Sequence, residues 1–232
     1  MEHQDEIYQS HAEGYDRLIQ REDFRGNLLP ALEAIVPLRG KIVVDLGTGT
    51  GRFPCLLAGI DAQVLGLDRS LAMLRVARAK LALLPQPAGR LAVGDNVALP
   101  VRSGLADIVL AGWTFGHATV WSQARWRQEV APALREAFRV LRTGGTAIVC
   151  ETLGTGSPEP APPTPALADY YRYLEQEWGF RRRVVATDYR FASVDEAVST
   201  LRFFFGEEMG DLVRSNHWTV VPEWTGIWWR HA

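Results

Sequence analysis

The chain has 232 residues, of which 47% are hydrophobic and 22% are charged, and its formal net charge is −2 at pH 7. This length suits one α/β domain with a large core, and the balanced charge excludes a general electrostatic attraction to nucleic acid or to an anionic membrane. The start of the chain is polar and acidic and no apolar run could span a bilayer, so we expect a cytoplasmic protein without a signal peptide. Cys55 and Cys150 lie in apolar stretches, which indicates buried thiols in a reducing compartment.

The first two thirds of the chain alternate between helical and strand patterns. Two helices are expected over residues 6–36, the first with Tyr8, His11 and Tyr15 at helical spacing and the second beginning near Asn27. The strands expected next cover approximately residues 41–47, 63–68, 90–94, 107–112 and 146–153. The helices between them are expected from Gly51 to about Ala58, from Ser70 to about Leu84, and over some ten residues ending at Leu141, with Pro132 in the first turn. This alternation predicts a parallel sheet covered on both faces.

The composition changes after the fifth strand. Residues 154–165 contain five prolines, which predicts an extended loop at the carboxyl edge of the sheet, followed by a helix that ends near Trp178. A sixth strand is expected over residues 182–191, then a helix capped by Ser193, and a last strand over residues 219–230. The sequence therefore predicts seven strands and contains no internal repeat.

A glycine-rich turn follows the first strand. Asp45 precedes Gly47, Gly49 and Gly51, and glycine is needed where the backbone turns with positive φ or where a ligand presses against it. A dinucleotide site is the alternative, but its fingerprint requires glycine at the sixth position, which Arg52 occupies. Asp45 would also repel a pyrophosphate, whereas it suits a ligand with an ammonium or sulfonium charge. A tight turn with no ligand is the simplest alternative.

Four segments in register carry a family resemblance. They resemble the motifs of class I S-adenosylmethionine (SAM) dependent methyltransferases of the small-molecule type, over roughly residues 40–155. The segments are VVDLGTGTGRF from residue 43, Val64–Asp68, Gly94–Asn96 and Val140–Gly145. The resemblance implies a Rossmann-like, doubly wound, mostly parallel seven-stranded sheet with an antiparallel last strand and a helical cap.

The resemblance also implies a division of the single domain, residues 1–232. We expect N-terminal cap helices in residues 1–36 and a cofactor-binding core in residues 37–153. A Pro-rich loop and lid helix in residues 154–180 and C-terminal strands and helices in residues 181–232 complete it. The cofactor would be SAM, with S-adenosylhomocysteine (SAH) as its product.

The resemblance assigns cofactor contacts residue by residue. Asp68 would accept both ribose hydroxyls, Asp95 would bind the adenine amino group, and Tyr15 would close over the methionine end of the cofactor. A main-chain carbonyl near Ala111 would bind the amino group. Two of these residues have a structural alternative: a turn for Asp95 and a helix anchor for Tyr15. The spacing of Asp68 from Gly47 fits the ribose of NAD as well as that of SAM. The complete set of expected cofactor residues is Tyr15, Asp45, Gly47, Thr48, Gly49, Gly51, Asp68, Arg69, Met73, Asp95, Asn96 and Ala111.

The loop after the fourth strand would line the methyl-acceptor pocket. His117 is the candidate general base because the pKa of histidine lies near neutrality, although a lone histidine is more often structural. Glu151 and Asp188 are weaker alternatives. We expect Trp113, His117 and Tyr171 in the substrate pocket, with core packing as the alternative for the aromatic rings.

Several absences narrow the function. No Asn/Asp-Pro-Pro-Tyr/Phe motif or Pro-Cys nucleophile follows the fourth strand, which argues against methylation of nucleic-acid bases. No His, Cys or Asp cluster has metal-ligand spacing. We therefore expect methyl transfer to an O, N or C nucleophile of a small molecule. The alternatives are a SAM-binding enzyme of other chemistry, such as cyclisation or rearrangement, and a non-catalytic SAM-binding module. The oligomeric state stays open.

Overall fold

The computed structural model describes residues 12–85 and 89–232. Tyr8 and His11, expected on the first helix, lie outside the described residues. Within those two ranges no helix is both long and apolar enough to cross a membrane.

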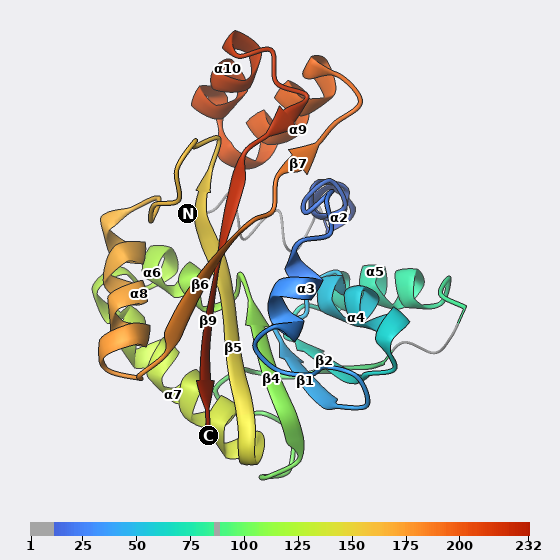
Figure 1. The fold of residues 1–232 in the computed structure, drawn as a ribbon, viewed down its shortest axis with the longest axis vertical. Coiled ribbons are helices and arrows are strands. Elements are labelled where there is room, and N and C mark those ends of the chain that lie inside the picture. Colours follow the sequence, from blue (N-terminus) through green and yellow to red (C-terminus); the bar gives the residue numbers. More distant parts are fainter. Residues whose placement is uncertain (1–11, 86–88) are drawn as a thin grey trace.

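The described residues form nine strands in two sheets. The strands are β1 (Ile42–Leu46), β2 (Gln63–Asp68), β3 (Arg90–Val93), β4 (Ala106–Gly112), β5 (Leu141–Thr155), β6 (Arg181–Ala186), β7 (Tyr189–Arg190), β8 (Val220–Val221) and β9 (Glu223–His231). Seven of them form the main sheet in the order β3-β2-β1-β4-β5-β9-β6 (Figure 1). Pairing is parallel from β3 to β5, and β9 runs antiparallel to both β5 and β6. The predicted fold class is thereby confirmed.

Helices cover both faces of this sheet. They are α2 (Ala12–Ile19), α3 (Leu28–Glu33), α4 (Arg52–Leu57), α5 (Leu71–Leu81), α6 (Ala118–Trp121), α7 (Trp126–Val140), α8 (Pro165–Gln176), α9 (Val194–Phe205) and α10 (Glu207–Ser215), with short 3₁₀ turns η1 (Ala58–Ile60), η2 (Phe115–His117) and η3 (Gln123–Arg125). One core cluster joins the sheet to α6, α7 and α8, and the other joins it to α3 and α4. The central strands β1 and β4 are mostly buried, which is why they are apolar runs, whereas the edge strands β3 and β6 are largely exposed.

Local sequence signals set the helix starts. The Ser70 hydroxyl accepts a hydrogen bond from the Met73 N–H at 3.3 Å and caps α5, and the Ser193 hydroxyl accepts one from Glu196 at 3.1 Å and caps α9. Each cap satisfies a backbone donor that has no partner inside the helix. Both starts agree with the sequence prediction.

Two predicted boundaries were wrong. Helix α7 begins at Trp126, so Pro132 lies inside the helix and not in its first turn. The apolar face of α7 extends back to the buried Trp126, which lies before the ten residues predicted as helix. The strand expected over 182–191 ends at Ala186 and resumes as β7, because Thr187 and Asp188 turn the chain toward β8.

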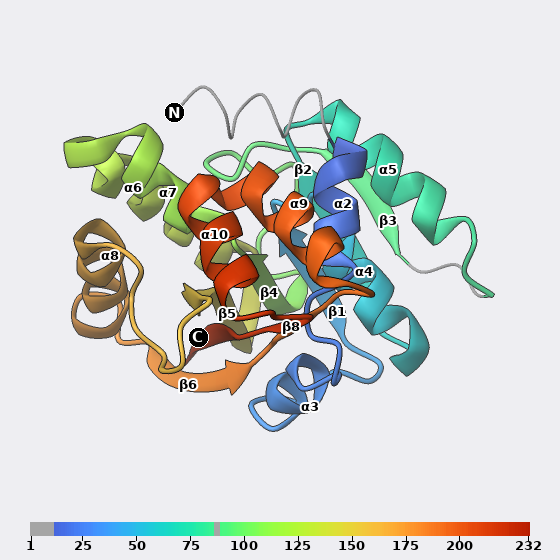
Figure 2. The same ribbon diagram turned by 90° about the horizontal axis from the view of Figure 1, so that it is seen from above.

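The cap also differs from the prediction. Helices α9 and α10 lie above the carboxyl edge of the sheet together with α2, and residues of these helices and of β7 and β8 form a third apolar cluster (Figures 1 and 2). Helix α8, expected as the lid, instead packs on the flank of the sheet beside α6 and α7, where Tyr170 and Tyr171 are buried in the main core. Its aromatic residues at helical spacing therefore mark a core helix.

Candidate functional site

The glycine-rich turn after β1 takes a left-handed backbone at each glycine. Gly47, Gly49 and Gly51 have φ of 65°, 53° and 82°. A Cβ added at Gly47 would lie 2.5 Å from Thr114 Oγ1, and one added at Gly51 would lie 3.0 Å from the Ala77 Cβ. At Gly49, which lines the cavity, an added Cβ would lie 3.9 Å from the Gly47 carbonyl oxygen and 4.0 Å from Tyr15, at ordinary contact distance. Side chains at these positions would be strained, and at Gly47 they would also overlap a neighbour.

Asp45 and Thr48 brace this turn from below. The Thr48 hydroxyl donates to Asp45 Oδ2 at 2.5 Å, and Oδ1 has no hydrogen-bond partner among the described residues. Asp45 is 1% exposed, and burial raises its pKa to about 7. Neither residue lines the cavity, so the structure places Asp45 under the turn and not on the ligand-facing surface that the sequence suggested.

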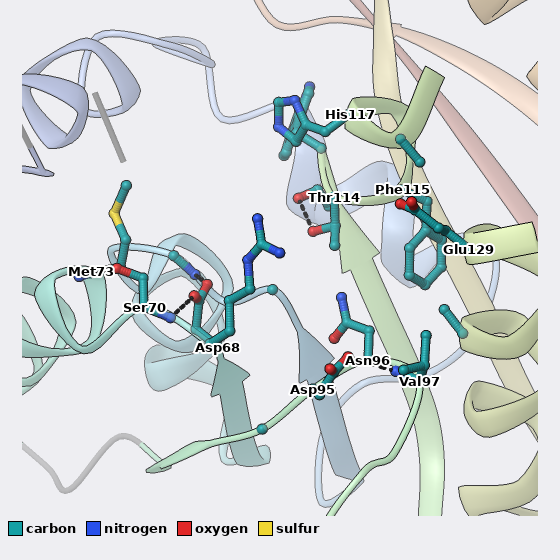
Figure 3. Close-up of a pocket in the computed structure, with 18 of the residues that line it drawn as sticks. Asp68, Ser70, Met73, Asp95, Asn96, Val97, Thr114, Phe115, His117 and Glu129 are labelled. Atoms are coloured by element: carbon teal, nitrogen blue, oxygen red, sulfur yellow. Dashed lines mark hydrogen bonds between the residues drawn. The ribbon is translucent and has the colours of Figure 1, made fainter. Parts of the chain in front are cut away.

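Asp68 is fixed by the backbone on both of its oxygens. Oδ2 accepts the Gly49 N–H and Oδ1 accepts the Ser70 N–H, each at 2.8 Å (Figure 3). Burial raises the pKa of this carboxyl, while the two backbone bonds act in the opposite direction. The side chain ends β2 and lines the cavity, where its orientation suits recognition of hydroxyl groups.

Asp95 and Asn96 form the turn that follows β3. Asp95 Oδ1 accepts the Val97 N–H at 3.0 Å, and Ala98 donates to the Asp95 carbonyl at 3.0 Å. Both side chains line the cavity across from Asp68 and Met73 (Figure 3). The turn chemistry and the predicted ligand position therefore coincide.

The other side of the cavity begins where β4 ends. Trp113 has φ of 49°, which is uncommon for a residue with a side chain, and its N–H donates to the Cys150 carbonyl at 2.7 Å. The Thr114 hydroxyl contacts the carbonyls of Leu46 and Gly112 at 3.1 and 2.9 Å.

His117 projects from η2 toward the cavity (Figure 3). Its ring stacks on Trp121, with the centroids 4.8 Å apart and the planes 14° apart, and the Arg69 guanidinium lies 5.3 Å from the Trp121 ring. These three side chains form one wall, so His117 has a defined orientation beside the space that a ligand would occupy.

Tyr171, predicted in the substrate pocket, and Glu151 and Asp188, the weaker candidates for a general base, do not line the cavity. Glu151 is 4% exposed; its Oε1 accepts the Gly116 N–H at 2.8 Å, and burial raises its pKa to about 8. It holds η2 from behind. Asp188 accepts the Glu223 N–H at 3.2 Å, and the Tyr171 hydroxyl donates to the Thr152 carbonyl at 2.7 Å. Each has a structural role inside the fold.

The cavity has a volume of about 730 Å³, which lies in the usual range for small-molecule sites. It brings together most of the predicted set, namely Tyr15, Gly47, Gly49, Asp68, Arg69, Met73, Asp95, Asn96, Trp113 and His117. Predicted residues that it leaves out are Asp45, Thr48, Gly51, Ala111 and Tyr171. Unpredicted lining residues are Ser70, Leu71, Ala72, Gly94, Val97, Gly112, Thr114, Phe115, Ala118, Trp121, Glu129, Val130 and Ala133.

The lining residues that sequence reasoning missed fall into two groups. Some are sequence neighbours of predicted ones, as Thr114 is of Trp113, and could have been included by proximity. Val130 and Ala133 lie on the buried face of α7, and nothing in an apolar helical pattern separates pocket wall from core. Among the residues of known placement, no group of three or more His, Cys, Asp or Glu side chains could hold a metal ion.

Comparison with protein families gives one match over the region just described. A family model described as a methyltransferase domain matches residues 44–149. This segment contains the glycine turn, Asp68, Asp95 and His117, and it covers a little under half of the chain.

Individual relatives extend this comparison. The chain is 30% identical over 153 residues to a demethylmenaquinone methyltransferase of Lactococcus lactis, covering 63% of this chain and 57% of that protein. It spans about half the length of the curated relatives it matches.

Solved structures share the fold. One, titled as the conversion of a disulfide bond into a thioacetal group during echinomycin biosynthesis, has a TM-score of 0.60 at 22% identity and covers 97% of this chain and 91% of its own. A SAM-dependent methyltransferase from Aquifex aeolicus has a TM-score of 0.56 at 15% identity, covering 86% and 87%.

Proposed function

We propose that this chain, which carries a class I SAM-dependent methyltransferase domain, transfers the methyl group of SAM to an O, N or C nucleophile of a small molecule. The observation that carries the proposal is the pairing of a backbone-oriented carboxylate, Asp68, with the left-handed glycine turn at Gly47 and Gly49 in one cavity.

The residues present fit the cofactor. Gly47 and Gly49 line the cavity, Asp68 would offer carboxylate oxygens to a ribose, and Asp95 and Asn96 would bind an adenine edge. Tyr15 lines the same cavity from α2, above the glycine turn; it would close over the methionine end. These assignments belong to the proposal.

When bound, SAM supplies a methyl group already activated by its sulfonium charge. The protein therefore has to orient the nucleophile and to exclude water, and alignment alone supplies much of the rate. His117 is placed to take a proton from an acceptor that must lose one. Its stacking on Trp121 would hold the ring in position during that transfer.

The acceptor that suits this cavity has a flat unsaturated ring. Besides Tyr15, four residues with rings line the cavity and would pack against such a molecule: Trp113, Phe115, His117 and Trp121. A quinol ring is one example, and the Lactococcus relative is named for a menaquinone precursor. We further propose a cytoplasmic protein with no nucleic-acid partner, in keeping with its net charge of −2.

A direct test uses methyl-labelled SAM with reduced 1,4-naphthoquinone and, in parallel, a panel of phenols and amines. Label should appear in at least one product together with SAH. Turnover with unlabelled product would instead favour SAM-assisted rearrangement, and tight SAM binding without any turnover would favour a binding module. Either of these outcomes would overturn the proposal.

The cofactor placement has its own test. The Asp68→Ala variant should bind SAH roughly 10- to 100-fold more weakly in titration calorimetry, because it loses charge-assisted hydrogen bonds. Asp169→Ala, at an exposed carboxylate on α8, is the matched control and should leave the affinity unchanged. Equal affinities of the two variants would contradict the assignment of Asp68 to the ribose.

A further inference from the structure

Trp113 forms part of the acceptor-side wall in a backbone conformation that few non-glycine residues adopt. Trp113 directly follows β4 and has a φ of 49°. The preceding residue, Gly112, lies so close to Phe53 that a side chain at this position would overlap the ring. Such conformations persist only where the surroundings impose them, and they concentrate at functional sites. The question is which contacts hold this indole in place.

Two consecutive side chains of the first turn of α4 pack against Trp113. The Arg52 Cζ lies 4.0 Å from the centre of the indole ring, and the Phe53 ring is stacked at 6.1 Å with an angle of 19° between the planes. A guanidinium at that distance is attracted by the ring electrons, and the attraction is stronger when water is excluded. Arg52 occupies the position at which a dinucleotide-binding motif has its third glycine. In this structure its side chain packs on Trp113.

Arg52 is itself fixed by a buried carboxylate. Its Nη1 lies 2.6 Å from Glu22 Oε2, and the two side chains are only 15% and 2% exposed. The Tyr189 hydroxyl donates to the same Glu22 oxygen at 3.3 Å. A buried guanidinium needs such a partner, and the pair leaves Arg52 little freedom to leave the indole.

The anchor comes from a distant part of the chain. Glu22 lies between α2 and α3, and the next residue, Asp23, donates its N–H to the Thr187 carbonyl at 3.0 Å. Helix α2 also carries Tyr15, which lines the cavity. The segment that closes one side of the cavity is thus tied, through Glu22 and Arg52, to the wall formed by Trp113.

We propose that Arg52, held by Glu22, is a positioning residue that sets the orientation of Trp113 and thereby the shape of the acceptor side of the cavity. The proposal rests on the proposed function because it takes this side of the cavity as the acceptor site. The contact between Arg52 and Trp113 does not depend on turnover. It predicts that loss of Arg52 disturbs the indole and acceptor recognition, while cofactor binding is kept because Asp68 and the glycine turn are untouched.

The test follows Trp113 by ¹⁹F NMR in protein labelled with 5-fluorotryptophan. Comparison with Trp113→Phe assigns its resonance among those of the eight tryptophans. The resonance should move by more than its line width in Arg52→Gln, in Arg52→Lys and in Glu22→Gln. Arg139→Gln, which breaks another arginine–glutamate pair away from Trp113, is the matched control and should leave it in place.

Two binding readouts complete the experiment. SAH affinity should change less than about threefold in Arg52→Lys. The KM for a naphthoquinol probe that the wild-type protein methylates should rise about tenfold with little change in kcat, as expected for a lost positioning contact. An unmoved Trp113 resonance in Arg52→Lys and Glu22→Gln would overturn the proposal, as would a loss of SAH affinity equal to the loss for the probe. If Arg52→Gln does not fold, these two conservative variants decide the outcome. If the wild-type protein methylates nothing, the proposed function fails, and the resonance still tests the positioning role.

Discussion

The β1–β3 side of the cavity and the side formed by β4, η2 and α6 differ in what holds their side chains in place. On the first side, Asp68 and Asp95 are oriented by backbone N–H groups at most nineteen residues away along the chain. On the second side, Trp113 and Gly116 depend on Arg52, Cys150 and Glu151, which other elements contribute. The side proposed for the cofactor is thus held by backbone groups of neighbouring strand-end loops, whereas the wall proposed for the acceptor is held by contacts between elements farther apart in the chain.

The largest effect that would separate the two sides is expected at His117. Replacement by Gln should lower turnover with a naphthoquinol probe by roughly 10²- to 10⁴-fold, the usual contribution of a general base, and leave SAH affinity unchanged. Steady-state kinetics and calorimetry measure the two quantities. His231→Gln, at the far end of β9, serves as the control. An equal loss of SAH affinity would mean that the two sides are not independent.

The converse experiment uses Gly47. Gly47→Ala should weaken SAH binding by about 100-fold, because the new methyl group overlaps Thr114 and the backbone is strained. Gly40 has a similar φ of 71° but no atom within 4 Å of an added Cβ, so Gly40→Ala carries the strain without the overlap. If both variants bind SAH equally well, close approach at Gly47 has no role in the cofactor site.

A pH experiment addresses the buried support of the acceptor wall. Burial raises the pKa of Glu151 from 4.5 to about 8. The folded protein therefore holds this proton more tightly than the unfolded chain, and its contribution to stability is complete below pH 4.5 and lost as the pH rises toward 8. Between pH 5 and 8 the free energy of unfolding of the wild-type protein should fall by roughly 3 kcal/mol more than that of Glu151→Gln.

Denaturant titrations at several pH values measure this difference. Burial also raises the pKa values of Asp45 and Glu223, to about 7 and about 8. Both groups contribute to the pH dependence of stability in the wild-type protein and in Glu151→Gln, so only the difference between the two pH curves reports on Glu151. Glu159→Gln at an exposed site is the control. Parallel curves for the wild-type protein and Glu151→Gln would show that the carboxyl titrates normally.

The smallest effect is expected at Tyr171. Tyr171→Phe removes one hydrogen bond to the Thr152 carbonyl, which should lower the free energy of unfolding by about 1 kcal/mol. SAH affinity and probe turnover should not change, since the side chain lies in the core. A raised KM for the naphthoquinol probe would instead support the sequence prediction that Tyr171 contacts the substrate.

The same contrast explains how far the sequence could predict this protein. The glycine turn, Asp68 and Asp95 are short motifs at strand ends, so their positions followed from the order of the strands. Tyr171 and Pro132 were misplaced because an aromatic or apolar helical pattern does not reveal which surface the helix packs against. Arg52 could be noted as an exception to a fingerprint, but its contact with Trp113 needs three-dimensional proximity between α4 and the end of β4.

The position of β9 has a consequence for how the chain is made. The last strand in chain order lies in the interior of the sheet, between β5 and β6, and pairs with both. Until β9 has been synthesised, β6 has no partner strand and β5 is paired only with β4. Unpaired strand edges invite association with other chains, so the partly made sheet is the stage most exposed to aggregation.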